Sequence, residues 1–196
     1  MALLIPKGYT TVGQIQNYLL HGIKSYFRPQ VEDWIARMEE YIEEQTRRVF
    51  IADESASEKI YEGNGMAYLF IDECVEITKL TIDDVEISSD DYFLYPANEL
   101  PKTRIKLSND SGLLFVADEQ NVQVEAKWGY SVGCPADIGF AATILVVGII
   151  NFSAEMAGEI QTKNIGTYSV AYKDQEDWQD FTKAQAILQR YTKVLI

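Results

Sequence analysis

Apolar side chains in residues 1–57 recur at the spacing of α-helices. A short helix is predicted to begin after Thr10 or Thr11 and to end at Gly22. A longer helix is predicted from Pro29, because proline is tolerated in a first helical turn. Its apolar face consists of Val31, Trp34, Ile35, Met38, Tyr41, Ile42 and Val49. We therefore expect two amphipathic helices in this part of the chain.

The opposite face of the longer predicted helix is charged, and Glu39 lies on it. Near the end of this helix, Glu43 stands four residues before Arg47, and Glu44 stands four residues before Arg48. Such pairs stabilise an exposed helix by roughly 0.2–0.5 kcal/mol each. We expect them to support the last turns of the helix.

Between residues 58 and 130 the spacing of apolar positions changes to two, which is typical of β-strands. Turn-forming residues separate the runs, and Gly63-Asn64-Gly65 is predicted to form a tight hairpin turn. The predicted strands are 59–61, 67–71, 75–82, 92–95, 103–107 and 121–128. We therefore expect an antiparallel β module of about six strands, inserted between helices.

Residues 138–154 carry no charge and follow Asp137 in the most apolar part of the chain. This stretch reaches only the lower limit for a membrane span, roughly 17 residues. Polar and small residues interrupt it, and no Lys/Arg cluster flanks it, so we expect a helix buried at the centre of a bundle and no contact with a membrane. A last amphipathic helix is predicted from about Glu176.

These elements predict an α+β fold with a helical bundle core, a long central apolar helix and an inserted antiparallel β module. The predicted parts are 1–57 for the N-terminal helices of the core and 58–130 for the inserted β module. Residues 131–196 are predicted to supply the central and C-terminal helices of the core.

The composition is that of an acidic globular protein, with 17 Lys+Arg against 30 Asp+Glu and a formal net charge of −13. Residues 32–101 hold 19 acidic and 5 basic side chains, a net charge of −14. This balance excludes a nucleic-acid site built on a basic patch. Two cysteines are too few for a disulfide framework and no charged-then-apolar leader opens the sequence, so we expect a reduced, intracellular setting.

Few residues suggest catalysis. The sequence has one histidine, His21, and no His or Cys accompanies it at ligand spacing. Cys74 lies in a strand-like run of residues and Cys134 precedes a predicted helix, so a structural role is favoured for both thiols. We therefore expect no cysteine–histidine catalysis, no cofactor and no enzymatic activity.

Three acidic pairs leave one enzymatic alternative open. They are Asp72-Glu73, Asp83-Asp84 and Asp90-Asp91. Carboxylates on converging loops could bind a hard cation and support a metal-dependent hydrolase. Their spacing lacks the alternating ligands and the Gly turn of a calcium loop, so solvated turn positions are the favoured interpretation and no metal is expected.

Five short segments occur in a characteristic order: 42–50 (IEEQTRRVF), 61–65 (YEGNG), 128–130 (WGY), 135–138 (PADI) and 165–170 (IGTYSV). With this order, residues 10–172 resemble the head-tail connector, or adaptor, proteins of long-tailed bacteriophages. None of the segments is catalytic. Arg47 stands where that family often has Gly.

The resemblance implies a structural protein of the virion, made in the host cytoplasm and placed at the head-tail interface. It implies a ring, usually of twelve copies, that docks under the portal protein and joins the head to the tail. Such a ring extends the channel through which double-stranded DNA passes without specific binding, and it contacts the next connector or tail protein. A tail-terminator or baseplate ring protein is the alternative from the same setting.

In that family the C-terminal segment reaches the portal. The implied portal-docking residues are Phe181, Leu188, Tyr191, Val194, Leu195 and Ile196. A ring would also let neighbouring copies share the burial of the apolar helix. The expected subunit-packing residues are Ile144, Val147, Ile150 and Phe152. The acidic block 32–101 is a candidate channel lining, because carboxylates repel the phosphates of a sliding duplex.

Overall fold

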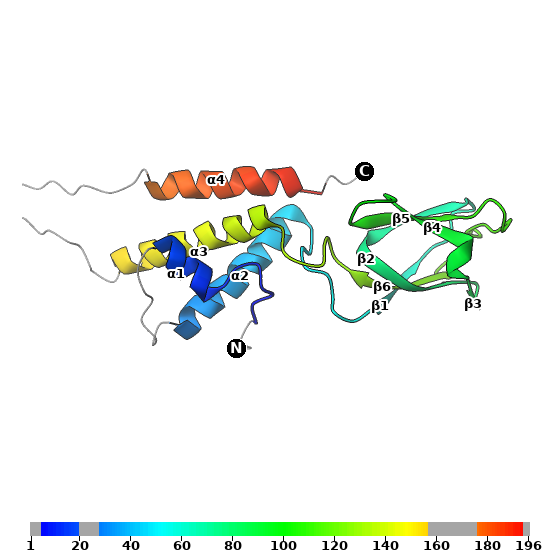
Figure 1. The fold of residues 1–196 in the computed structure, drawn as a ribbon, viewed down its shortest axis with the longest axis horizontal. Helices are drawn as coiled ribbons and strands as arrows, with labels where there is room; N and C mark the ends of the chain where they lie inside the picture. The colour runs from blue at the N-terminus through cyan, green and yellow to red at the C-terminus, as the bar shows by residue number, and fades with distance from the viewer. Residues whose placement is uncertain (1–4, 20–27, 157–175, 194–196) are drawn as a thin grey trace, which may run out of the picture. The chain divides into compact units, whose positions relative to one another are not determined.

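The protein is represented by a computed structural model that describes residues 5–19, 28–156 and 176–193. The chain divides into two compact units. The helical unit consists of Met1–Arg48 and Cys134–Ile196, and the sheet unit consists of Val49–Gly133. Each unit has its own set of elements, as Figure 1 shows.

The helical unit contains α1 (Val12–Leu19), α2 (Arg28–Thr46), α3 (Ala136–Met156) and α4 (Glu176–Tyr191). The apolar helix α3 contacts each of the other three (Figure 1). A buried cluster joins α1, α2 and α3 through Val12, Ile15, Val31, Ile35, Val146 and Val147. The predicted ends at Gly22 and beyond Val194 lie outside the described residues.

The prediction of a helical bundle core is wrong. The protein has a mixed α+β fold in which a six-stranded antiparallel sheet encloses a hydrophobic core of its own. Thirteen buried residues form that core, from Leu69 on β2 to Trp128 on β6. The helices pack along α3, which contacts α1, α2 and α4. The sheet can form its own core because the period-two pattern places apolar side chains on one face of every long strand.

The sheet has the strand order β1-β6-β2-β5-β4, with β3 paired to β2. Its strands are β1 (Ser57–Tyr61), β2 (Tyr68–Ile82), β3 (Val85–Glu86), β4 (Tyr92–Tyr95), β5 (Lys102–Leu107) and β6 (Val122–Trp128). All pairings between these strands are antiparallel, as predicted. The predicted strands 67–71 and 75–82 are one continuous strand, β2, whose register shifts between Phe70 and Cys74. The first part of β2 pairs with β5 and the second with β6.

The sequence predicts turn positions at Asp83-Asp84, and the structure adds a short strand, β3, after this turn. Asp83 and Asp84 adopt positive φ angles of 49° and 62°, the pattern of a type I′ turn. The turn pairs Ile82 with Val85 and so creates β3. By contrast, Gly63-Asn64-Gly65 is not a hairpin turn, because β1 and β2 lie on opposite sides of β6.

No helix in the described part of the chain combines the length and the apolar character needed to cross a bilayer. The apolar stretch 138–154 falls within α3, and much of it is buried in the helical unit. Ile138, Ala141 and Ala142 are fully buried there. Packing against α1, α2 and α4 therefore accounts for the apolar character of this part of α3.

The end of α2 is set by a left-handed residue. The helix ends at Thr46, and Arg47 has a φ of 56° while its N–H donates to the Glu43 carbonyl at 2.6 Å. This geometry is usually adopted by Gly at the first position after a helix. The predicted helix therefore stops before Val49, and Arg47 does not continue the helical face of Glu43.

Arg47→Gly is expected to raise the free energy of unfolding of the helical unit by about 1 kcal/mol, because a side chain is disfavoured at this φ. The Arg47 side chain is exposed, so little packing is lost. Arg37→Gly, at an exposed position inside α2, is the control and should lower stability by about 1 kcal/mol. Urea unfolding of both variants checks the opposite signs, and a destabilised Arg47→Gly would contradict the account of the helix end.

Candidate functional site

The two thiols lie in environments that disfavour a nucleophile. Cys74 is fully buried on β2, and its burial raises the pKa of the thiol to about 11. Burial also raises the pKa of the Cys134 thiol to about 11, with a contribution from the negative charge of Glu39. Both groups are therefore protonated thiols near neutral pH. His21 lies outside the described residues.

The acidic pairs occupy structural positions. Asp72 lies within β2 and not in a turn, and its carboxylate accepts hydrogen bonds from Lys59 Nζ at 2.9 Å and from the Tyr61 hydroxyl at 3.3 Å. Asp83 and Asp84 form the turn between β2 and β3. Within the ranges that the structure describes, no three His, Cys, Asp or Glu side chains cluster as metal ligands would. The geometry therefore gives no support to the hydrolase alternative.

Asp90 and Asp91 belong to a single 3-10 turn, η2 (Ser89–Asp91). The Ser88 side chain caps this turn by accepting a hydrogen bond from the Asp90 N–H at 3.3 Å. The turn leads into β4. This pair was correctly assigned to a turn from the sequence.

The predicted portal-docking residues fall on and after α4. Phe181 is 41% exposed, whereas Leu188 is only 4% exposed because α4 packs on α3. Tyr191 is half-buried. Val194, Leu195 and Ile196 lie outside the described residues. In the described part of α4, the fold leaves Phe181 as the most exposed of the predicted docking side chains.

The predicted subunit-packing residues lie on α3. Ile144 and Val147 are 2% and 4% exposed, so the chain's own helices already cover them. Ile150 is half-buried against the cluster that joins α1, α2 and α3. Phe152 lies in α3, and its side chain is outside the described residues. Sequence reasoning missed Phe140, whose 44% exposed ring faces Tyr18 of α1 with centroids 6.1 Å apart.

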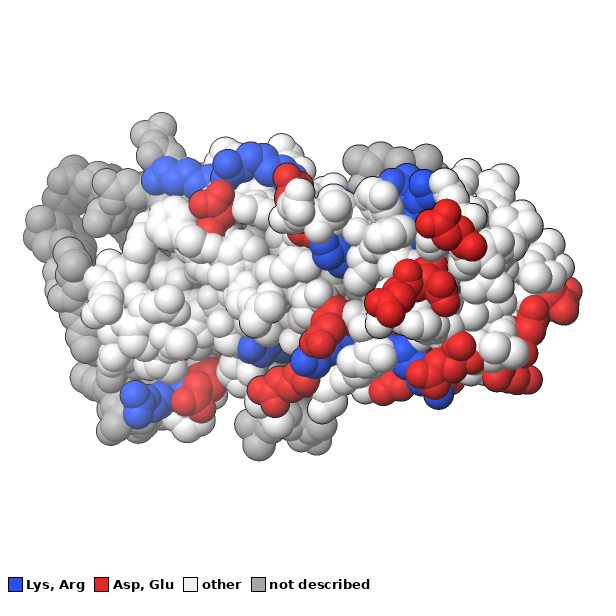
Figure 2. Space-filling view, turned by 45° about the vertical axis from the view of Figure 1, so that its right-hand side comes forward, with Lys and Arg blue, Asp and Glu red and all other residues white. Residues whose placement is uncertain are grey.

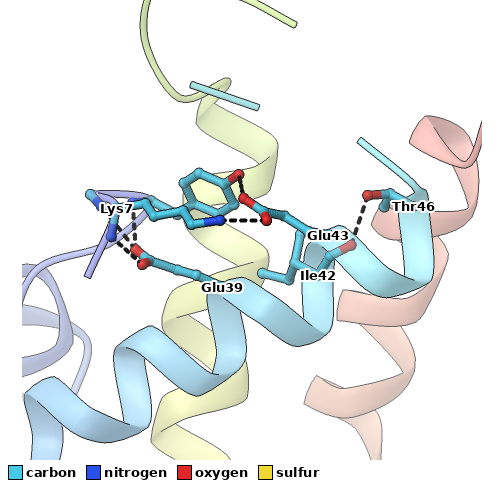
Figure 3. Close-up of polar contacts among 7 residues, drawn as sticks. Lys7, Glu39, Ile42, Glu43 and Thr46 are labelled. Atoms are coloured by element: carbon cyan, nitrogen blue, oxygen red, sulfur yellow. Dashed lines mark hydrogen bonds and ion pairs between the residues drawn. The ribbon is translucent and has the colours of Figure 1, made fainter. Parts of the chain in front are cut away.

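A fully buried carboxylate, Glu39, holds the N-terminal segment on α2 (Figure 3). Its two oxygens accept hydrogen bonds from the backbone N–H groups of Lys7, Gly8 and Tyr9, at 2.5, 3.0 and 2.7 Å. Three successive N–H groups that converge on one carboxylate satisfy a charge that would otherwise be costly to bury. No local pattern marks Glu39, which the sequence places on a charged helix face.

Glu43, one turn further along α2, contacts the same segment (Figure 3). Its carboxylate accepts hydrogen bonds from Lys7 Nζ and from the Tyr9 hydroxyl, both at 2.5 Å. Next to Tyr9, the hydroxyl of Thr10 lies 2.7 Å from that of Thr143 on α3. The N-terminal segment is therefore attached to both α2 and α3, and Glu43 pairs with Lys7 where the sequence predicted Arg47.

Negative charge is distributed over both units. The acidic block 32–101 covers α2 in the helical unit and β1 to β4 in the sheet unit. Figure 2 shows separate groups of carboxylates on one face, with Lys and Arg among them. The acidic residues of block 32–101 are therefore spread over several elements of both units.

These observations define a mixed α+β protein of two compact units. No protein-family model matches the chain, and no curated protein matches it. The chain is similar to a solved structure described as "Neck of empty GTA particle computed with C6 symmetry". The sequences are 14% identical, the match covers 100% of this chain and 94% of that chain, and the TM-score is 0.57. At this identity the likeness concerns the fold.

Proposed function

We propose that this protein is a structural, non-enzymatic subunit of the neck that joins the head of a phage-like particle to its tail. The observation that carries the proposal is the fold likeness to a neck chain over the whole of this chain. The likeness spans both units of this chain, and the functional step from fold to neck subunit is made by analogy.

Two further observations support the proposal. The order of short segments along the sequence resembles that of the head-tail connector family. Among the described residues, burial raises the pKa of both thiols, Cys74 being buried and Cys134 half-buried, and no three His, Cys, Asp or Glu side chains cluster as metal ligands would.

The finer proposal is a ring that docks under the portal and extends the DNA channel. The neck of the similar particle was computed with C6 symmetry. A ring of twelve copies contains a six-fold axis and is compatible with that symmetry. We place the ring between the portal and the next connector or tail protein.

The charge of the protein fits a channel that does not retain DNA. Each copy has a formal net charge of −13, so a twelve-membered ring is strongly acidic. Lys and Arg clusters would bind the duplex in a salt-dependent manner, whereas carboxylates repel its phosphates. We propose that this balance lets double-stranded DNA pass without specific binding.

The test is to mix the purified protein with the portal protein encoded in the same genome. We expect rings of twelve copies on the portal by native mass spectrometry and electron microscopy. A monomer that ignores the portal would overturn the connector assignment. Binding to isolated tail tubes in place of the portal would favour a tail-terminator protein.

Phe181→Asp, alone or with Leu195→Asp and Ile196→Asp, is expected to weaken portal binding about tenfold or more, which corresponds to about 1.4 kcal/mol. A charge placed in an apolar contact costs desolvation energy. Ala186→Asp is the matched control, because it adds the same charge at another exposed position of α4. Interferometry on immobilised portal measures the difference, and equal affinities would refute docking through the C-terminal region.

A further inference from the structure

The outer face of β2, β5 and β4 carries aromatic and cationic side chains in alternation. We call it the aromatic–cation patch, and it consists of Tyr68, Phe70, Phe93, Tyr95, Arg104 and Lys106. In the register of the sheet, Arg104 stands between Phe70 and Tyr95 on the neighbouring strands. Lys106 stands between Tyr68 and Phe93 in the same way.

The rings of the patch face solvent. Phe70 is 63% exposed and Phe93 is 55% exposed, although each lies in a regular strand. An open pocket of about 300 Å³ adjoins them and is lined by Phe93, Tyr95, Lys106 and the residues 107–110. Exposed apolar side chains that form one contiguous patch are typical of an interaction site.

The two cations of the patch lie between aromatic rings. The Arg104 guanidinium lies 4.8 Å from the Tyr95 ring centroid and 5.9 Å from that of Phe70. Its Nε atom is buried, and no described residue accepts a hydrogen bond from it. Among the residues that the structure describes, neither Arg104 nor Lys106 forms an ion pair. In so acidic a chain, two unpaired cations between aromatic rings are suited to an acidic partner with an apolar group.

The chain itself presents such a group at the other end of β2. The acidic hairpin consists of Asp83, Asp84, Val85 and Glu86, and all four residues are exposed. Val85 is 63% exposed between the acidic side chains. The 3.9 Å distance from Glu86 to Lys79 leaves that carboxylate weakly paired.

We propose that the aromatic–cation patch of one copy receives the acidic hairpin of a second copy of this chain. Val85 packs on the exposed rings, and Asp84 and Glu86 pair with Arg104 and Lys106. Because the two surfaces differ and lie at opposite ends of β2, the contact is head-to-tail and repeats around a ring. Closure of these contacts into a ring rests on the proposed function. The contact between two copies is tested in the isolated protein.

Charge favours a protein partner over DNA at this patch. The patch holds two cations, and Lys102, the next alternate position of β5, donates its Nζ hydrogen bonds to the carbonyls of Pro96 and Ala97. Asp110 lines the adjoining pocket. A duplex would also approach a chain whose net charge is −13. Phosphate binding needs several cations that release counterions together.

The experiment is a charge exchange read out by sedimentation velocity over a range of protein concentrations. Arg104→Glu with Lys106→Glu, and separately Asp84→Lys with Glu86→Lys, should each weaken self-association at least tenfold. Mixing the two double variants, or combining all four changes in one chain, should restore it, because opposite charges meet again. Lys59→Glu with Lys127→Glu is the control for the change in charge, and it also breaks the exposed ion pairs of Lys59 with Asp72 and of Lys127 with Glu76. It should nevertheless self-associate like the wild type as long as it folds.

Folding of each variant is checked by circular dichroism, and Val85→Asp gives an independent test at an exposed hairpin position. Unchanged self-association in the double variants, failure of the exchange to restore it, or a wild-type protein that stays monomeric would overturn the proposal. Binding of a short DNA duplex that is lost in Arg104→Glu with Lys106→Glu would assign the patch to DNA instead. Portal binding is measured separately, so failure of this contact and failure of the connector assignment are distinguishable.

Discussion

Glu39→Ala is expected to lower the free energy of unfolding of the helical unit by about 3 kcal/mol or more. The carboxylate is fully buried and accepts hydrogen bonds from the backbone N–H groups of Lys7, Gly8 and Tyr9. Its removal leaves three donors without partners and detaches the N-terminal segment from α2. Urea unfolding measures the loss, and hydrogen exchange at Lys7–Tyr9 locates it.

Glu40→Ala is the control for this prediction, because Glu40 is the exposed neighbour on the same helix. It should change stability by less than about 0.5 kcal/mol. Glu39→Gln keeps one acceptor oxygen and should fall between the two. Equal unfolding midpoints for Glu39→Ala and Glu40→Ala would show that the backbone hydrogen bonds contribute little.

Gly129→Ala is expected to destabilise the sheet unit by about 3 kcal/mol or more, because backbone atoms would have to move. Gly129 has a φ of 145°, where side chains are disfavoured. A Cβ at this position would lie 2.4 Å from Ala52 Cα and 2.8 Å from Ala52 N. The variant should unfold at a lower temperature in calorimetry.

Gly133→Ala provides the matched control in the sheet unit, since no atom lies within 4 Å of its added Cβ. It should leave the unfolding temperature nearly unchanged. If both alanine variants behave alike, the close approach of Ala52 to Gly129 is not a constraint on the fold. The sequence offered only the segment Trp128-Gly129-Tyr130 as part of a resemblance, and the structure supplies the steric reason for its glycine.

The strands were largely predictable because their pattern is local. Alternating apolar side chains located β1, β4, β5 and β6 to within two residues. The continuity of β2 was not predictable, since Asp72-Glu73 interrupts the apolar pattern where the register shifts. Two adjacent charged residues are typical of a turn. Asp72 is accommodated in the strand by an ion pair with Lys59, and a local sequence pattern does not reveal this contact because Lys59 lies outside β2.

The candidate surfaces were less predictable. The apolar stripe of α4 was recognised, but only the packing of α4 on α3 separates buried Leu188 from exposed Phe181. The aromatic–cation patch combines three strands that are not all consecutive, so no single segment displays it. The prediction of a helical bundle core was wrong for a related reason. Periodicity indicates which face of an element is buried, but it does not indicate which other element packs on that face.

The sequence by itself determined the α+β character, the antiparallel strands, the four helices of the described regions and the acidic charge. These depend on residue periodicity and composition, which act over a few neighbouring residues. The tertiary structure alone decided that the sheet has its own core, that Glu39 holds the N-terminal segment, and that Gly129 lies against Ala52. Each of these depends on contacts between residues far apart in the chain, and such contacts leave no periodic trace in the sequence.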